Sequence, residues 1–168
     1  MGEVCAEIVD GREKQGAINM DKPSYHFKVS SDALVYEFES VSEHKSIHKI
    51  VVYEPLQDEL YHLGFGDLTE DGEIDYKIVS GNHDMDRVLM TVVQTMFLFF
   101  EKYPEKKFVF GGSTESRSRL YRQIITKFIE NIELYFDVQG FTTKGEQEPF
   151  EKNRDYYAFL ISQKYEEI

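Results

Sequence analysis

The sequence predicts an α+β fold, in which a mainly antiparallel sheet carries two helices on one face. Between residues 25 and 80, apolar residues recur with a period of two, which is typical of strands with one buried face. Residues 84–102 change to spacings of three and four, which indicates a helix. One further helical pattern and three further strand patterns follow, so the predicted order is ββββ-α-β-α-β-β.

Four strands are predicted before the first helix, at residues 34–41, 47–53, 60–68 and 73–79. Asp71-Gly72 separates the last two, and Asp-Gly between alternating runs is a strong signal for a hairpin turn. The acidic run around this turn also matches part of the spacing of a calcium-binding loop. Ile78 stands where the closing glutamate of such a loop belongs, so we predict an acidic hairpin tip instead.

Two helices are predicted, and each has capping signals. The first covers residues 84–102, with Asn82 or Asp84 as its N-cap and Pro104 as its stop. The second covers residues 115–134 and follows Ser113-Thr114, which supplies its cap. The accompanying strands are expected at residues 108–110, 135–141 and 156–161, with a polar loop at residues 142–154.

Length and composition fit one domain, because 168 residues with 41% apolar content can bury a hydrophobic core. We expect residues 1–19 to be a flexible N-terminal extension and residues 20–168 to form a single α+β domain. Cys5 is the only cysteine, which excludes an intrachain disulfide. The first residues lack the features of a signal peptide, and no apolar run reaches membrane-spanning length. We therefore expect a cytoplasmic protein without a membrane partner.

Charge is unevenly distributed along the chain. The formal net charge of -12 counts against binding to duplex nucleic acid, because such binding needs a basic surface. Residues 102–127 nevertheless contain seven Lys or Arg and two Glu, whereas residues 54–75 contain eight acidic residues and no Lys or Arg. This separation can orient an anionic ligand or an acidic protein partner, and it is equally the pattern of two solvated faces.

The stretch from Phe108 to Arg122 combines the features of an anion site. An apolar strand runs into two glycines, a Ser-Thr pair follows, and a helical pattern then carries three arginines. Helix starts attract anions through unpaired N–H groups, and arginine pairs with oxyanions through two hydrogen bonds. The ordinary alternative is a corner whose hydroxyls cap the helix and whose arginines pair with carboxylates. The residues of the candidate site are Gly112, Ser113, Thr114, Arg117, Arg119, Tyr121 and Arg122.

The sequence specifies no catalytic residues. His83 and Asp84 can form an acid–base pair, but neighbours in sequence need not share the required geometry. His44 and His48 are four residues apart in a segment without a helical pattern, and no glutamate completes a zinc motif. The glycine-rich corner matches neither a P-loop nor a dinucleotide-binding fingerprint. We predict neither a metal nor a cofactor.

Several short motifs resemble those of a bacterial family of unknown function. Its members read Gly-Ser-Thr, two residues, Arg, one residue, Arg-Leu-Tyr-Arg after a short strand, as residues 112–122 do here. They also read Asn, one residue, Asp before the first helix, as in Asn82-His83-Asp84. The resemblance covers residues 22–160 and implies a small stand-alone bacterial protein with no established activity. The family has a small residue at the position of His83, which weakens the acid–base hypothesis.

The sequence favours a binding module for an anionic ligand, such as a nucleotide phosphate or a single-stranded nucleic-acid backbone, at residues 112–122. A second hypothesis is a protein-interaction module, in which the basic segment meets the acidic segment of another copy or an acidic partner. A third is a group-transfer enzyme, since the element order loosely resembles the later part of the acetyltransferase fold. That fold holds its cofactor near the position of Gly81, but its glycine-rich signature is missing here.

Overall fold

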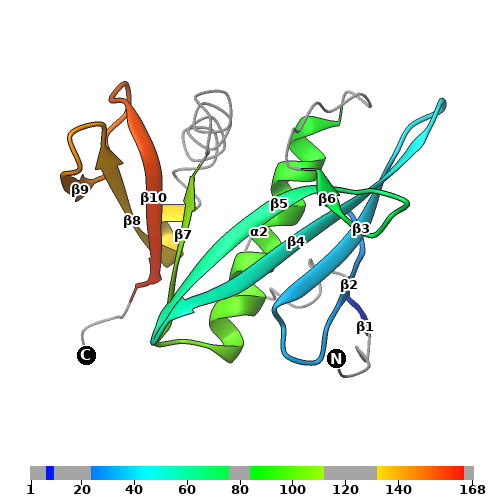
Figure 1. Ribbon diagram of the computed structural model, residues 1–168, viewed down its shortest axis with the longest axis horizontal. Coiled ribbons are helices and arrows are strands. Elements are labelled where there is room, and N and C mark those ends of the chain that lie inside the picture. The colour runs from blue at the N-terminus through cyan, green and yellow to red at the C-terminus, as the bar shows by residue number, and fades with distance from the viewer. Residues whose placement is uncertain (1–6, 10–23, 76–83, 112–131, 165–168) are drawn as a thin grey trace. The chain divides into compact units, whose positions relative to one another are not determined.

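The computed structural model describes residues 7–9, 24–75, 84–111 and 132–164 (Figure 1). The chain forms two compact units. The first consists of Met1–Glu54 and Gly64–Tyr103, and the second of Pro55–Leu63 and Pro104–Ile168. The single domain expected over residues 20–168 stays a prediction.

The first unit is built on an antiparallel sheet. Among the described residues the strand order is β1-β2-β3-β4-β5, with β6 paired to β5. β5 and β6 form the predicted acidic hairpin, in which the Thr69 amide donates to the Glu73 carbonyl at 2.8 Å and Gly72 adopts a φ of +81°. The strands are β1 (Glu7–Val9), β2 (Phe27–Val29), β3 (Val35–Val41), β4 (Ser46–Gln57), β5 (Leu60–Leu68) and β6 (Ile74–Asp75).

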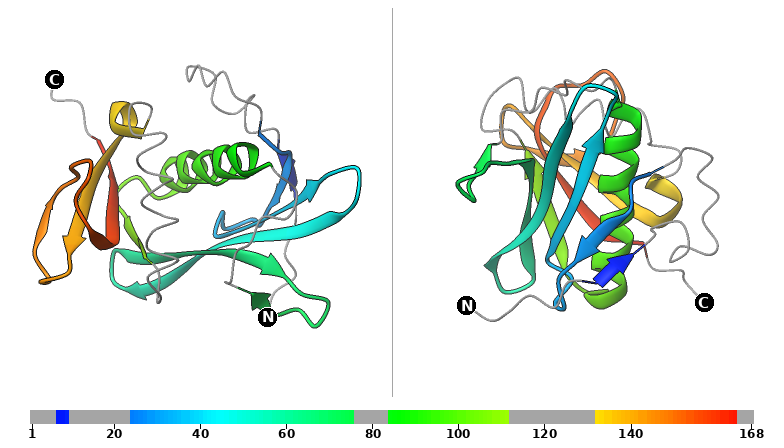
Figure 2. Two further views of the ribbon diagram at one scale, coloured as in Figure 1. Left: turned by 90° about the horizontal axis from the view of Figure 1, so that it is seen from above. Right: turned by 90° about the vertical axis from the view of Figure 1, so that its right-hand side faces the viewer.

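Helix α2 (Met85–Lys102) packs on one face of strands β2 to β4 (Figure 2). The Tyr53 hydroxyl of β4 lies 2.9 Å from the Thr95 hydroxyl, and its ring stacks on Phe99 with centroids 4.5 Å apart. Phe27 and Tyr36 continue this aromatic row across the sheet at centroid distances of 5.7 and 5.8 Å. The row forms the core of this unit because aromatic rings remove large apolar areas from water.

The buried tyrosines predict how stability depends on alkaline pH. Burial raises the pKa of Tyr36 and Tyr53 well above the ordinary value of 10.0. The unfolded chain releases these protons near pH 10, whereas the folded protein keeps them. The contribution of the two tyrosines to the free energy of unfolding is therefore fully present below pH 10 and is lost as the pH rises further. We expect a late, cooperative step in tyrosinate absorbance that coincides with the loss of circular dichroism. Ionisation of every tyrosine before unfolding would contradict this core.

The second unit has the strand order β5-β7-β10-β8-β9. The start of β5 runs parallel to β7, pairing Leu60 with Lys107, and the other pairs are antiparallel. Phe110 of β7 packs against Phe159 of β10 with centroids 5.4 Å apart. Residues 132–135 are helical and lead directly into β8. The remaining strands are β7 (Lys107–Gly111), β8 (Phe136–Thr142), β9 (Gln147–Pro149) and β10 (Tyr156–Gln163).

The α+β class is confirmed, with a mostly antiparallel sheet and one parallel pair. The predicted order ββββ-α-β-α-β-β is wrong, because it lacks three short strands. β1 lies in the segment predicted to be an extension, β2 precedes the first predicted strand, and β9 lies in the predicted polar loop. Each has three residues, too few for a period, and each is a strand because it pairs with a neighbouring strand. The flexibility of residues 1–19 stays a prediction.

Candidate functional site

The anion site predicted from Gly112 to Arg122 lies outside the described residues, as does His83. The strand that leads to it is described. β7 ends at Gly111, where an added Cβ would lie 2.6 Å from the Tyr157 carbonyl oxygen and 2.8 Å from the Ala158 Cβ. The close approach of β10 therefore explains the glycine at position 111 without a ligand.

A hollow of about 380 Å³ lies in the first unit, between β2 and β3. It is lined by residues 25–28, residues 37–39, His48 of β4 and Arg87 of α2, and we call it the β2–β3 hollow. β2 pairs with β3 at Lys28 and Val29, whereas β3 continues to Val41. The chain before Lys28 thus parts from β3, and this separation makes room for the hollow.

Tyr25 is fixed beside the β2–β3 hollow by its backbone and by its hydroxyl. Its amide donates to Thr91 Oγ1 at 2.8 Å, and its hydroxyl accepts from the Val41 amide at 3.2 Å. The hydroxyl also donates to the Asp84 carboxylate, which accepts a second hydrogen bond from Ser40. Burial and the hydrogen bond to Asp84 raise the pKa of Tyr25, so the phenol remains a donor near neutral pH.

Asp84 differs from its predicted role. It occupies the N-cap position of α2, but its side chain makes no cap hydrogen bond. Its carboxylate instead joins the segment before β2 to β3 through Tyr25 and Ser40. Because the Asp84 carboxylate accepts hydrogen bonds from two hydroxyl groups, we assign Asp84 a structural role in holding α2 to the sheet.

The structure also contains a buried charge that the sequence analysis does not identify. Lys49 of β4 is fully buried and pairs with Asp67 of β5, and its ammonium lies 6.0 Å from the centre of the Phe65 ring. Alternation along β4 places Lys49 on the same face as Val51 and Tyr53, so the strand pattern indicates that Lys49 is buried. Since Asp67 neutralises Lys49 within the protein, the pair is structural.

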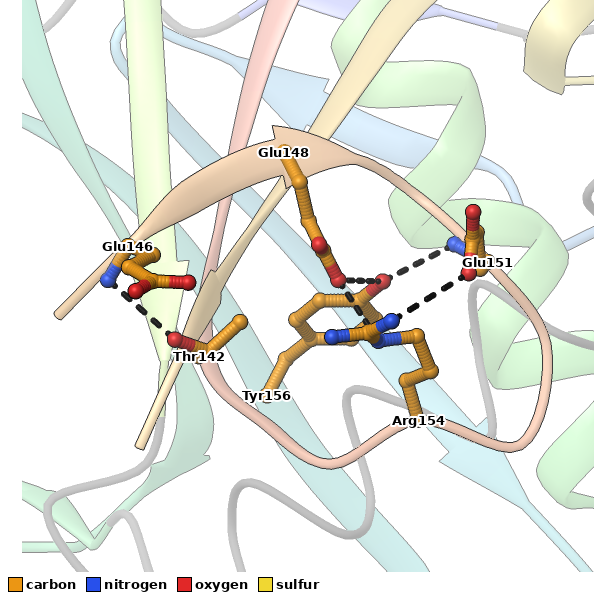
Figure 3. Close-up of polar contacts among 6 residues, drawn as sticks. All are labelled: Thr142, Glu146, Glu148, Glu151, Arg154 and Tyr156. Atoms are coloured by element: carbon orange, nitrogen blue, oxygen red, sulfur yellow. Dashed lines mark hydrogen bonds and ion pairs between the residues drawn. The ribbon is translucent and has the colours of Figure 1, made fainter. Parts of the chain in front are cut away.

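A further polar cluster lies in the second unit, between β9 and β10 (Figure 3). Arg154 Nε lies 2.7 Å from Glu148 Oε1, and the Tyr156 hydroxyl donates to the same oxygen at 3.0 Å. The Glu151 amide donates to the Tyr156 hydroxyl at 3.0 Å, and Arg154 also pairs with the Glu151 carboxylate. These groups satisfy one another, so the cluster is a clamp on the β9–β10 loop and not a ligand site.

The described parts of the chain show neither a metal-ligand cluster nor a membrane-spanning helix. Within them, no three His, Cys, Asp or Glu side chains come together in a way that could hold a metal ion. Nor does any helix there have both the length and the apolar character needed to cross a membrane.

A family model matches residues 21–164, which is most of the chain. The chain belongs to DUF6934, a family of unknown function. This confirms the expected membership in a family without an established activity, whereas the Gly-Ser-Thr to Arg motif and a bacterial origin stay predictions. No curated protein and no solved structure matches the chain. Membership in DUF6934 assigns neither a ligand nor a reaction to the chain.

Proposed function

We propose that this DUF6934 protein is a binding module for an anionic ligand, with a phosphate or a nucleic-acid backbone held at the corner that follows β7. Backbone N–H groups and hydroxyls of Gly112–Thr114 donate to the anion in this proposal. The arginines at positions 117, 119 and 122 neutralise it. Tyr121 stacks on a base or donates a hydrogen bond.

The observation that carries the proposal is the position of β7 in its sheet. β7 lies between β10 and the start of β5, which runs parallel to it. Ligands of open sheets with parallel strands are commonly bound beyond the carboxyl ends of those strands. The sequence leaves β7 at this end through Gly112, and the helical residues 132–135 agree with a helix predicted to end at residue 134.

Replacing the three arginines Arg117, Arg119 and Arg122 by glutamine is expected to abolish most binding of inorganic pyrophosphate. A hydrogen bond to a charged group contributes about 1.5–3 kcal/mol, so each single variant should weaken binding about ten-fold or more. Isothermal titration calorimetry of the full chain measures these affinities. Arg154→Gln removes a charge from the clamp of Figure 3 and is the matched control. Unchanged affinity in the triple variant would rule the proposal out.

Three further measurements separate the alternatives. If the ligand is a nucleic-acid backbone, its affinity must fall with salt concentration in proportion to the phosphates contacted. Sedimentation at low and high salt tests the protein-interaction hypothesis, because an assembly held by opposite charges dissociates as salt rises. Stabilisation by coenzyme A in a thermal unfolding assay would favour the group-transfer hypothesis over the binding module.

A further inference from the structure

The main chain of Glu39 directs a hydrogen-bond donor and an acceptor toward β2. Along an antiparallel strand the backbone groups of successive residues point alternately to the two neighbouring strands. The Leu34 carbonyl, at the start of β3, accepts from the Tyr53 amide of β4 at 2.8 Å. The next carbonyl, that of Val35, accepts from the Ser30 amide on the β2 side at 2.9 Å. Odd-numbered residues of β3 therefore face β2 with their N–H and C=O groups, and Glu39 is one of them.

Glu39 is the position at which β2 and β3 have parted. Two residues earlier, Glu37 still pairs with Lys28 of β2. Two residues later, the Val41 amide donates to the Tyr25 hydroxyl at 3.2 Å. Between these two closed positions, the main chain of Glu39 has no hydrogen-bond partner among the described residues. Because Glu39 lines the β2–β3 hollow, its N–H and C=O groups are available to a molecule that fills this hollow.

The side chains around the β2–β3 hollow do not favour an ionic ligand. Lys28 and Arg87 are matched in number by Glu37 and Glu39. Both carboxylates already have partners on β4. Strand alternation places Lys28 on the sheet face opposite α2, whereas Arg87 belongs to α2, so the two cations do not converge. A ligand of the hollow is therefore expected to be held by uncharged groups, and the main chain of Glu39 supplies them.

The open groups of Glu39 define the class of ligand. A residue of a paired antiparallel strand would exchange two hydrogen bonds with Glu39, one to its carbonyl and one from its amide. A lactam, a carboxamide and the edge of a pyrimidine base each carry the same adjacent N–H and C=O groups in one plane. We infer that the β2–β3 hollow binds a small neutral molecule through such an amide group, which takes the place of the missing strand residue opposite Glu39.

The dimensions and walls of the hollow agree with this class of ligand. Its volume of about 380 Å³ falls within the range of about 300–1,000 Å³ that is typical of small-molecule sites. The rings of Tyr25 and Phe38, with centroids 5.8 Å apart, contribute apolar wall beside the polar groups. The site consists of described residues of the first unit and is independent of the corner after β7.

Nuclear magnetic resonance of the isotope-labelled full chain tests this inference, with 2-piperidone and uracil as separate probes. We expect saturable shifts centred on the Glu39 amide proton, which moves downfield and exchanges more slowly with solvent as it becomes hydrogen-bonded. The relative affinities of the two probes distinguish a simple lactam from a pyrimidine base. N-methyl-2-piperidone keeps the carbonyl but lacks the N–H donor, so it should bind at least about five-fold more weakly than 2-piperidone.

Two variants at one position separate the main chain from the side chain. Glu39→Pro removes the N–H that faces the hollow and no hydrogen bond between β3 and β4, and it should weaken binding at least about five-fold. Glu39→Ala is the matched control, because it removes the carboxylate, keeps the N–H and should leave the affinity unchanged. If Glu39→Pro does not fold, the comparison of the two piperidones on the wild-type chain decides.

Three results would each overturn the inference. The first is the absence of saturable shifts at the Glu39 amide up to the solubility of both probes, which would mean that water alone occupies the hollow. The second is equal affinity for 2-piperidone and its N-methyl form. The third is an equal loss of affinity in Glu39→Ala and Glu39→Pro, which would assign the binding to the carboxylate.

Discussion

Asp67→Asn is expected to destabilise the protein by about 3 kcal/mol, the lower end of the range for removing one partner of a buried ion pair. Lys49 is fully buried, so its ammonium cannot turn to water when the carboxylate is lost. The lower end applies because the Asp67 side chain is 26% exposed, and solvent weakens the interaction. Urea unfolding of the variant and the wild type measures the loss as a shift of the transition midpoint.

Lys49→Met is the matched variant, because it removes the buried charge and keeps most of the apolar volume. Asp67 reaches water and stays hydrated without its partner, so we expect a loss below about 1.5 kcal/mol. The double variant should be more stable than Asp67→Asn alone, since it contains no buried unpaired ammonium. Equal losses in the two single variants would show that burial of the Lys49 charge is not the cause.

Gly140→Ala is expected to cost about 3 kcal/mol through overpacking. Gly140 of β8 is buried, and an added Cβ would lie 2.4 Å from Cδ1 and Cε1 of the Tyr156 ring. The ring cannot move away freely, because its hydroxyl bonds to Glu148 and to the Glu151 amide and its face packs on Phe150. Thermal unfolding followed by circular dichroism measures the loss, together with fraying of the β9–β10 loop by hydrogen exchange.

Gly145→Ala is the control for this substitution. Gly145 has a φ of +84° with open space around it, so alanine there meets backbone strain but no clash and should cost about 1 kcal/mol. Replacing Tyr156 by alanine in the Gly140→Ala background should remove the clash, and the two losses should then be less than additive. Full additivity would mean that the ring is not what excludes a side chain at position 140.

The longer elements could be predicted because each extends over enough residues to show a pattern. β3 alternates between more buried and more exposed residues from Val35 to Val41, and α2 extends over 18 residues, from Met85 to Lys102. β2 and β9 have three residues each, and their strand character comes from their neighbours. The parallel pairing of β5 with β7 could not be predicted either, because the alternation within a strand does not depend on the direction of the neighbouring strand.

Less of the candidate site could be predicted, because its contacts join distant segments. The turn at Asp71-Gly72 follows from local chemistry and is confirmed. Asp84 has the local signal of a helix cap, but its partners Tyr25 and Ser40 lie 59 and 44 residues away in the sequence. The β2–β3 hollow depends on where two strands part, which no local pattern shows. The burial of Lys49 could be predicted only in part. Its place in the alternation of β4 indicates burial, but lysine is a residue type that is usually exposed.

The most direct test of the proposed function is a titration of the isotope-labelled full chain with inorganic pyrophosphate at constant ionic strength, observed through its backbone amide signals. The proposal predicts saturable shifts of the Ser113 and Thr114 amides, accompanied by the Arg117 and Arg122 side-chain signals. If these signals remain in place at millimolar pyrophosphate, the residues after β7 form a structural corner and the anion-binding function is contradicted.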